Sequence, residues 1–485
     1  MAATPTVPNA GPTSYDLIIH GTRLLLHHRA AARRLREIRL HLRTNPSTGP
    51  LRLLPLHPPF SHKPPASFQN FQSSPSTSPA PGSSTARRHG RRPSDSGAGH
   101  QCEFKSVDGS LIIRGALCSS ADSRQAIFKD RSLELGEKRE MMRFLRLVQG
   151  HIGDEEGSRV SEEDLEMPFV EFLKRQRLPP KIRSIILYAI VLAEYDQESG
   201  EGCKKLIKTK DGIASIGLYI KSVGRFPNAV GAFIYPMYGH GELPQAFCRC
   251  AAVKGALYVL RMPVVEILAD EETKEYKGVN LASGQEILSQ HLIVEPSSKV
   301  PSSVLLPLDH EGSNASNLSE KVARGVCVTS SSLKQDLSNI LVIFPPGSLH
   351  AGQLTTVRAL QLSSNVAVCP QGMYVVHLST SCDSAMNALF SLPNLDNCEG
   401  ISRNNEGAEV SKPTLIWSAV YDQEVTQASF GTVCSSPLPD ANLDYRDLLE
   451  STMELFSHMY PQEEFLPQVP ATENDDEDYS GSSEQ

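Results

Sequence analysis

Apolar residues recur along the chain with two different periods, which separate predicted helices from predicted strands. Within 122–152, Met141, Phe144, Leu145 and Val148 fall at i, i+3, i+4 and i+7, the spacing of one face of an amphipathic helix. Further helices are predicted over 167–178, 181–195, 211–224, 243–260 and 442–461. Short runs of β-branched and aromatic residues predict strands within 14–22, 102–113, 264–287, 339–346, 355–363, 372–380 and 414–421.

The order of these elements predicts an α/β (α+β) protein of two domains. A helical domain over 125–224 is inserted into a sheet-containing domain built from 101–124 and 225–465. The strand region 102–113 is expected to form a pair with a hairpin-type turn at Asp108-Gly109. In the last helix, the residues expected to face inward are Leu448, Leu449, Met453, Phe456 and Met459.

Residues 23–100 do not continue the pattern of the first strand. The part before Asn45 predicts a basic helix, whereas 45–100 is rich in Pro, Ser, Arg and Gly and is expected to be disordered. Residues 1–100 carry 13 Lys and Arg against three Asp and Glu, although the whole chain has a net charge of −8. No basic repeat is interleaved with stacking aromatic residues, which argues against nucleic-acid binding. The acidic tail 466–485 is expected to be a disordered, solvated end.

Composition narrows the class of protein. Forty per cent of the 485 residues are hydrophobic, enough for a core, and no apolar run is long enough to predict a membrane span. The N-terminus lacks the pattern of a secretory signal, so a cytoplasmic location is expected. The ten cysteines have no repeating frame, and Cys248 and Cys250 are spaced unlike zinc ligands. We therefore predict no metal site and no disulfide framework.

Residues 233–261, FIYPMYGHGELPQAFCRCAAVKGALYVLR, concentrate glycine, histidine and charged residues in one span. Gly239-His240-Gly241 lacks the third glycine and the Lys-Ser/Thr of phosphate-binding loops, which disfavours a nucleotide site. His240 could serve as a general base, but no nucleophile lies at a motif spacing, and an exposed turn residue is the favoured interpretation.

Two pairs of charged or aromatic residues are candidate contacts. Glu242 and Arg249 lie about two turns apart on one side of a helix that has Pro244 in its first turn. They are either an ordinary surface ion pair or two contacts on a protein-binding surface. Phe128 and Arg139 are by default a core residue and a solvated residue, but they would suit a binding hot spot if both were exposed.

The segment 233–260 closely resembles the signature of the superfamily of Rab GDP-dissociation inhibitors and Rab escort proteins. The segments DSRQAIFKDRSLELGEKREMMRFL, PFVEFLKRQRLPPKI and SLKQDLSNILVIFPPGSL resemble its escort branch, in a plant-like form, and the resemblance covers about 102–465. It implies a flavoprotein-like sheet domain that binds the GTPase and a helical domain that docks Rab geranylgeranyltransferase.

The resemblance also implies a role without catalytic residues or a cofactor. An escort protein, component A of the transferase, presents GDP-bound Rab GTPases to the catalytic heterodimer and delivers the geranylgeranylated product to membranes. It works from the cytosol and contacts the lipid and the membrane transiently. By family match, Phe128 and Arg139 imply transferase contacts, because they share the family's spacing of eleven residues. The residues that imply Rab contacts are Tyr238, Glu242, Arg249 and Tyr258.

The start of the chain departs from the family. The family's first strand leads into a Gly-Thr-Gly-Leu-Pro-Glu-Ser turn, whereas this chain reads HGTRLLL, with Arg23 where a tight turn needs glycine. The family's following βα unit and its Tyr-Gly-Gly segment are absent from 23–100. We therefore hypothesise that 23–100 reflects a shifted reading frame or a mis-assembled gene model. Transcript sequencing should restore a glycine-rich βαβ start, and a transcript identical to this sequence would contradict the hypothesis.

Three other functions stay open on the sequence. A plain Rab GDP-dissociation inhibitor would bind prenylated Rab and ignore the transferase. A defective family member, lacking its first βαβ unit, would expose apolar sheet edges and aggregate. A flavin-dependent oxidoreductase would share the superfamily fold, but the broken HGTRLLL turn argues against dinucleotide binding.

Overall fold

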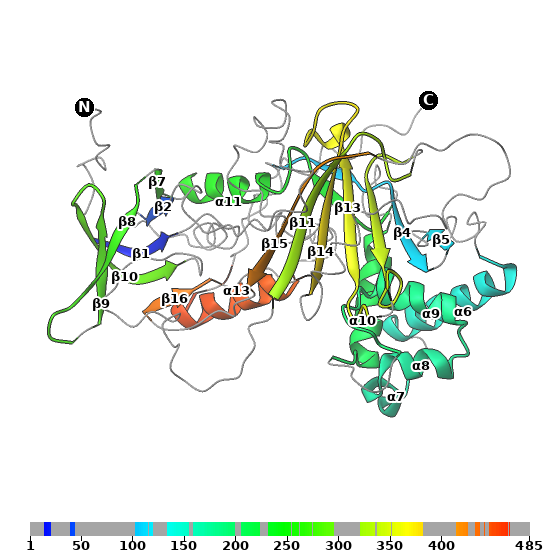
Figure 1. The fold of residues 1–485 in the computed structure, drawn as a ribbon. Helices are drawn as coiled ribbons and strands as arrows, with labels where there is room; N and C mark the ends of the chain where they lie inside the picture. The colour runs from blue at the N-terminus through cyan, green and yellow to red at the C-terminus, as the bar shows by residue number, and fades with distance from the viewer. Residues whose placement is uncertain are drawn as a thin grey trace, which may run out of the picture.

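The computed structural model describes residues 14–20, 39–43, 102–119, 133–223, 231–294, 321–381, 414–424, 432–436, 441, 446–463 and 465, with gaps at 115, 155–158, 199–204, 254, 261, 274, 335–336 and 351. Within them, the chain forms two seven-stranded sheets and one two-stranded sheet (Figure 1). A group of helices packs at one end of the second sheet (Figure 1). The predicted α/β class is confirmed.

The first sheet has the order β7-β2-β1-β10-β9-β8, and β16 pairs with β10. Its strands from β7 to β10, together with β16, run parallel, whereas β8, β9 and β10 form an antiparallel meander. Strands β8 and β9 lie within 264–287, where strands were predicted. Helices α11 (Glu242–Val253) and α13 (Arg446–Met459) pack on its central strands. The strands are β1 (Ser14–His20), β2 (Arg39–Arg43), β7 (Ala256–Leu260), β8 (Val264–Ala269), β9 (Tyr276–Leu281), β10 (Glu286–Val294) and β16 (Val433–Ser435).

The predicted basic helix before Asn45 is wrong, at least in its last part. Arg39–Arg43 is strand β2, which lies in parallel between β1 and β7. The letters RLHLR alternate with a period of two, which suits a strand better than a helix. The rest of 23–100, including the stretch expected to be disordered, lies outside the described residues.

The second sheet has the order β15-β11-β14-β13-β12-β4-β5. Neighbouring strands are antiparallel, except that β12 and β4 are parallel. The runs predicted as strands within 339–346, 355–363, 372–380 and 414–421 all lie in this sheet. Its strands are β4 (Gly109–Arg114), β5 (Ala116–Ser119), β11 (Lys321–Thr329), β12 (Ile340–Phe344), β13 (Val357–Ser363), β14 (Tyr374–Ser381) and β15 (Leu415–Glu424).

The hairpin predicted at Asp108-Gly109 does not form. Strand β3 (Phe104–Ser106) pairs instead with β6 (Ile234–Pro236), while β4 joins the second sheet. The Asp108 carboxylate accepts hydrogen bonds from the backbone amides of Ser338 and Asn339, at 3.1 and 2.8 Å. These bonds, between residues more than 200 positions apart, tie Asp108 to the segment that leads into β12, so the chain passes on to a different sheet.

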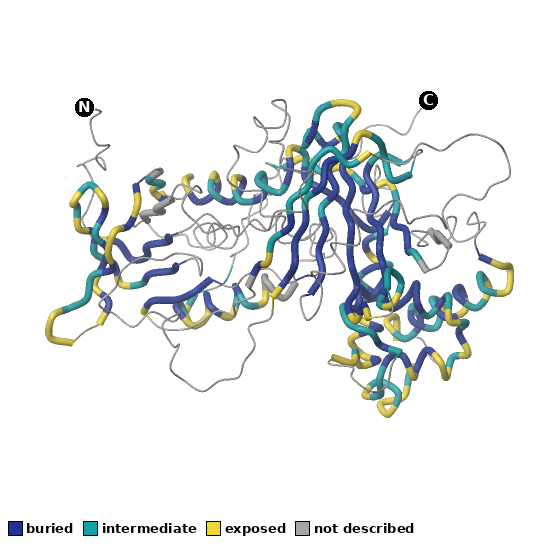
Figure 2. Tube along the Cα trace, viewed as in Figure 1, coloured by how far each residue is buried: buried dark blue, intermediate teal, exposed yellow. Residues whose placement is uncertain are grey.

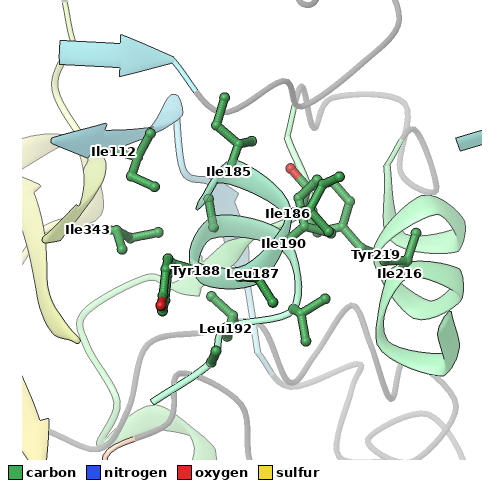
Figure 3. Packing of buried hydrophobic residues seen from close by; sticks show 14 of the residues in the cluster. Ile112, Ile185, Ile186, Leu187, Tyr188, Ile190, Leu192, Ile216, Tyr219 and Ile343 are labelled. Atoms are coloured by element: carbon green, nitrogen blue, oxygen red, sulfur yellow. The ribbon is translucent and has the colours of Figure 1, made fainter. Parts of the chain in front are cut away.

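The helices form one hydrophobic core with the second sheet. Buried residues of the π-helix η3 (Ile185–Ile190) lie between Ile112 and Ile343 of the sheet and Ile216 and Tyr219 of α10 (Figure 3). Met141, Phe144 and Val148 of α6 are buried as predicted, and Leu145 is half-buried. The helices are α6 (Leu135–Ile152), α7 (Glu162–Glu166), α8 (Phe169–Arg175), α9 (Pro180–Ser184), which runs into η3, and α10 (Thr209–Ser222).

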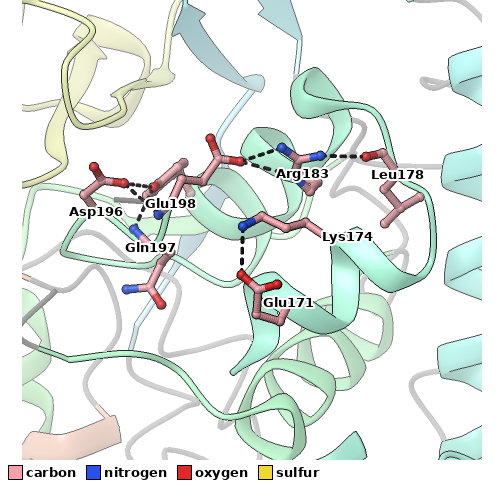
Figure 4. Close-up of polar contacts among 8 residues, drawn as sticks. Glu171, Lys174, Leu178, Arg183, Asp196, Gln197 and Glu198 are labelled. Atoms are coloured by element: carbon pink, nitrogen blue, oxygen red, sulfur yellow. Dashed lines mark hydrogen bonds and ion pairs between the residues drawn. The ribbon is translucent and has the colours of Figure 1, made fainter. Parts of the chain in front are cut away.

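Polar contacts hold the segment that follows η3. Arg183 donates to the carbonyl of Leu178 at 3.0 Å and pairs with the Glu198 carboxylate at 3.1 Å (Figure 4). Exposed and half-buried residues of these helices face away from the shared core (Figure 2). Among the described residues, no helix is long and apolar enough to cross a membrane.

The last helix matches its expected inward face where the side chains are described. Phe456 and Met459 are buried, Met453 is half-buried, and Leu455, which was not predicted to face inward, is also buried. The side chains of Leu448 and Leu449 lie outside the described residues.

Candidate functional site

A tight turn over residues 237–241 joins strand β6 to helix α11. Gly239 has φ 103°, a conformation that glycine adopts without steric cost. Its amide donates to the carbonyl of Pro236 at 3.2 Å, and the amide of Glu242 donates to the carbonyl of Gly239 at 3.2 Å. The turn therefore closes on itself and places Glu242 at the first position of the helix.

Tyr238 projects from this turn into solvent. Its side chain is 68% exposed, and its φ of 64° is in the left-handed region, where a bulky residue is strained. The Tyr238 amide donates to the carbonyl of Val366 at 2.9 Å, and the preceding Met237 amide donates to the carbonyl of Glu103 at 2.9 Å. Two segments distant in sequence thus hold the strained turn, and no local sequence signal marks Val366 or Glu103.

His240 is not the exposed turn residue that we expected. Its ring lies edge-on against that of Tyr235, with centroids 4.7 Å apart, and its Nε2 atom is inaccessible to solvent although the residue as a whole is half-buried. Burial, with smaller contributions from nearby His377 and Arg324, lowers the pKa of His240 from 6.5 to about 3. A group that binds a proton so weakly is a poor general base at neutral pH.

Glu242 and Arg249 lie on the outer side of α11. Their nearest charged atoms, Oε2 and Nη2, are 4.0 Å apart, and the side chains are 24% and 54% exposed. The Glu242 carboxylate also accepts a hydrogen bond from Gln245 at 3.3 Å. An ion pair at this distance contributes little to stability, and the guanidinium of the exposed Arg249 can donate to an additional acceptor.

Tyr258 occupies a different position from the one its sequence context suggested. The helix predicted over 243–260 ends at Val253, because Gly255 has φ 93° and turns the chain into strand β7. Tyr258 is half-buried on that strand and packs against the cluster that contains Leu17 and Phe247. Tyr238, Glu242 and Arg249 therefore share the exposed side of one turn and helix, and Tyr258 lies on the adjoining strand.

The second candidate pair lies on another part of the molecule. Arg139 is exposed on α6, among the helices that cover the second sheet. Phe128 lies outside the described residues, so its expected contact role stays a prediction. The structure does not bring Arg139 to the surface around α11.

The described residues contain no group of three His, Cys, Asp or Glu side chains placed to hold a metal ion. Cys102 packs beside α11 and donates its thiol to the carbonyl of Glu242 at 3.6 Å. Burial raises the pKa of Cys102 to about 11, which keeps the thiol protonated and unreactive at neutral pH. Neither His240 nor Cys102 is therefore a reactive group at neutral pH.

Comparison with known proteins identifies relatives of this chain in sequence and in fold. The family model described as GDP dissociation inhibitor matches residues 96–406. Rab escort protein 1 of Arabidopsis thaliana is 48% identical over 418 residues, which cover 80% of this chain and 74% of that protein. The crystal structure of a Rab GDI from Plasmodium falciparum has a TM-score of 0.68 at 15% identity and covers 94% of this chain and 99% of that one, which shows the same fold.

A more distant relative is longer than this chain. Rab proteins geranylgeranyltransferase component A 2 of Mus musculus is 30% identical over 386 residues, which cover 77% of this chain but only 58% of that protein. The chain therefore spans most of the Arabidopsis protein and a little over half of the mouse one.

Proposed function

The chain belongs to the GDP dissociation inhibitor family, and from this we propose that it is a Rab escort protein that presents GDP-bound Rab GTPases to Rab geranylgeranyltransferase. The proposal rests on the names of two relatives, one a Rab escort protein and the other a component A of that transferase. We further propose that the chain is an accessory subunit without catalytic residues, working in the cytosol. It would hold the geranylgeranyl lipid on Rab and contact membranes transiently.

The observation that carries the proposal is the exposed surface around α11. Tyr238, Glu242 and Arg249 combine an aromatic ring, a carboxylate and a guanidinium on one side of a short structural unit. Aromatic residues and arginine are enriched where proteins bind one another. The segment that carries these residues is also the one that resembles the family signature, so we assign them, with Tyr258 on the adjoining strand, to Rab binding.

We assign the transferase contact to the exposed face of α6. Arg139 is free to donate forked hydrogen bonds to a carboxylate of the partner. Because α6 belongs to the helices on the second sheet, the two partners would occupy different parts of the molecule at the same time. Such separation suits a protein that brings a GTPase to an enzyme.

A reconstituted prenylation assay tests this function. Purified Rab geranylgeranyltransferase and a GDP-bound Rab would receive labelled geranylgeranyl diphosphate with and without the full chain. We expect lipid transfer only when the chain is present, and Arg139→Ala should reduce transfer more than it reduces Rab binding. Rab binding without any transfer would identify a GDP-dissociation inhibitor, whereas neither activity, with a relative active in parallel, would identify a defective family member.

A further inference from the structure

Val253, the last residue of α11, is unusually exposed for an aliphatic side chain. Its exposed fraction is 86%, the highest of any large hydrophobic residue in the described part of the chain, and Tyr238 follows at 68%. A single exposed aliphatic residue needs no explanation by itself. Its position relative to the rest of α11 is what makes it informative.

Val253 has no part in ending the helix. The amide of Gly255 donates to the carbonyl of Ala252 at 3.0 Å, and the left-handed Gly255 reverses the chain. Ala251 and Ala256, which hold the positions of the apolar contact that usually accompanies such a helix end, are both buried in one cluster. The local structure therefore does not require a valine at position 253.

Val253 is in line with the charged pair on the outer side of α11. At 3.6 residues per turn, Glu242, Arg249 and Val253 lie within about 40° of one another around the helix axis. The side chains of Glu242 and Arg249 are 24% and 54% exposed, and Val253 as a whole residue is 86% exposed. Glu242, Arg249 and Val253 thus place an acidic, a basic and an aliphatic side chain along roughly 16 Å of helix. The aromatic Tyr238 lies just before them.

We propose that Val253 is a further contact of the GTPase-binding surface, an apolar anchor beyond Arg249. This inference rests on the proposed function. The complementary surface of the GDP-bound GTPase would present a carboxylate to Arg249 and an apolar side chain about 6 Å further along the helix axis. Charge complementarity would orient the partner, and burial of Val253 would add affinity.

The test measures affinity and stability on the same full-length variants. Rab GTPases of Arabidopsis thaliana, loaded with fluorescent methylanthraniloyl-GDP, would be titrated with the chain and with Val253→Ala and Val253→Lys. Losing the two methyl groups of valine from an apolar contact should weaken binding roughly tenfold, and lysine should weaken it further. Alanine is the better helix former, so Val253→Ala should leave the melting temperature unchanged or raise it. Val265→Lys, a 43% exposed valine of β8, is the matched control and should bind normally.

The outcomes separate this inference from the function on which it rests. In one outcome the unaltered chain binds Rab, Arg249→Ala weakens binding and both Val253 variants bind normally. The proposed contact of Val253 is then wrong, and the escort function stands. If the unaltered chain binds no Rab, both are overturned. If Val253→Lys slows lipid transfer at saturating Rab without changing Rab affinity, Val253 belongs to a transferase contact and the proposal is contradicted.

Discussion

At the scale of single residues, the surface around α11 depends on a residue held in an unfavourable backbone conformation. Tyr238 is left-handed and points into solvent, so neither its backbone nor its packing explains why a tyrosine occupies the position. Strained residues of this kind are concentrated at functional sites. The hydrogen bond from the Tyr238 amide to the carbonyl of Val366 holds the backbone in this conformation and so keeps the ring exposed.

Tyr238→Asn should separate stability from binding. Asparagine tolerates the left-handed region, where an ordinary residue costs roughly 1–2 kcal/mol, so the free energy of unfolding should stay unchanged or rise by about 1 kcal/mol. Loss of the exposed ring should weaken Rab binding by about tenfold or more, the effect of removing an aromatic anchor. Urea unfolding and fluorescence titration measure the two quantities. Tyr238→Phe keeps the ring and the strain, and a comparable loss of affinity in that variant would show that the hydroxyl, rather than the ring, makes the contact.

Two half-buried histidines with solvent-inaccessible ring nitrogens, His240 in this turn and His377 on β14, should make stability depend on pH. Burial lowers the pKa of His240 to about 3 and that of His377 to about 4, whereas both titrate near 6.5 when unfolded. Between these values the unfolded chain binds protons that the folded protein does not, so acidification below pH 6.5 favours unfolding. Each histidine should cost up to about 1.4 kcal/mol per pH unit until its folded-state pKa is reached. Urea midpoints from pH 7 to 4.5 check this, and His377→Gln should flatten the slope. A midpoint independent of pH would contradict the lowered pKa values of both rings.

At the scale of helices and strands, local pattern predicted elements well and their partners poorly. The apolar spacing of α6 and the strand pattern of 264–287, which contains β8 and β9, are encoded within each segment, and both predictions are confirmed. The Asp108-Gly109 hairpin failed because Asp108 bonds to Ser338 and Asn339, which no neighbouring residue reveals. Strand β2 was missed because arginine and leucine are also good helix formers. The alternation of RLHLR with a period of two, however, is typical of a strand.

Two glycines in helices should respond oppositely to the same substitution. A Cβ on Gly212 of α10 would lie 2.7 Å from ring atoms of Phe169, whereas a Cβ on Gly136 of α6 would meet nothing within 4 Å. Alanine favours a helix over glycine by up to about 1 kcal/mol, so Gly136→Ala should stabilise the protein by roughly 0.5 kcal/mol. In Gly212→Ala the clash should dominate and destabilise by about 1–3 kcal/mol. Thermal or urea unfolding of both variants measures the contrast. Equal effects of the two substitutions would mean that α10 and α8 are not packed as closely as described.

At the scale of the whole molecule, the helices and the second sheet share one core that reaches the turn before α11. Tyr235 and Val366 belong to the same cluster of buried residues as η3, and Met237 packs against it. The surface around α11 is therefore positioned by contacts across most of the chain. The sequence indicated candidate residues such as Glu242 and Arg249 through a motif, but it could not indicate these contacts. The backbone hydrogen bonds that hold the turn join Met237 to Glu103 and Tyr238 to Val366, in both cases more than 100 positions apart.

The buried Arg358 of β13 connects three parts of this architecture. Its guanidinium donates to the carbonyls of Leu192 and Ala193, at 2.8 and 3.3 Å, and to that of Ala441 at 3.0 Å. Leu192 and Ala193 directly follow η3, and Ala441 precedes α13, so one side chain links the helices and the C-terminal segment to the sheet. The side chain is 1% exposed, which strengthens its hydrogen bonds and makes their loss costly.

Arg358→Met should therefore destabilise the protein far more than the loss of an exposed arginine. Methionine fills a similar volume but cannot donate to these carbonyls. The carbonyls of Ala193 and Ala441 keep hydrogen bonds from the hydroxyls of Thr356 and Ser379, at 2.8 and 3.2 Å, so the main loss falls on the carbonyl of Leu192. A buried polar group that loses its partner costs about 1–3 kcal/mol, and a destabilisation of that size is expected. Arg146→Met, on the exposed face of α6, is the matched control and should change the unfolding free energy by less than about 0.5 kcal/mol. Urea unfolding followed by the fluorescence of Trp417 on β15 reports on the second sheet directly.

Because Arg358 joins helices to sheet, the variant should also lose cooperativity, with far-ultraviolet circular dichroism and tryptophan fluorescence giving different midpoints. Coincident and unshifted midpoints would show that the three parts are held together without it.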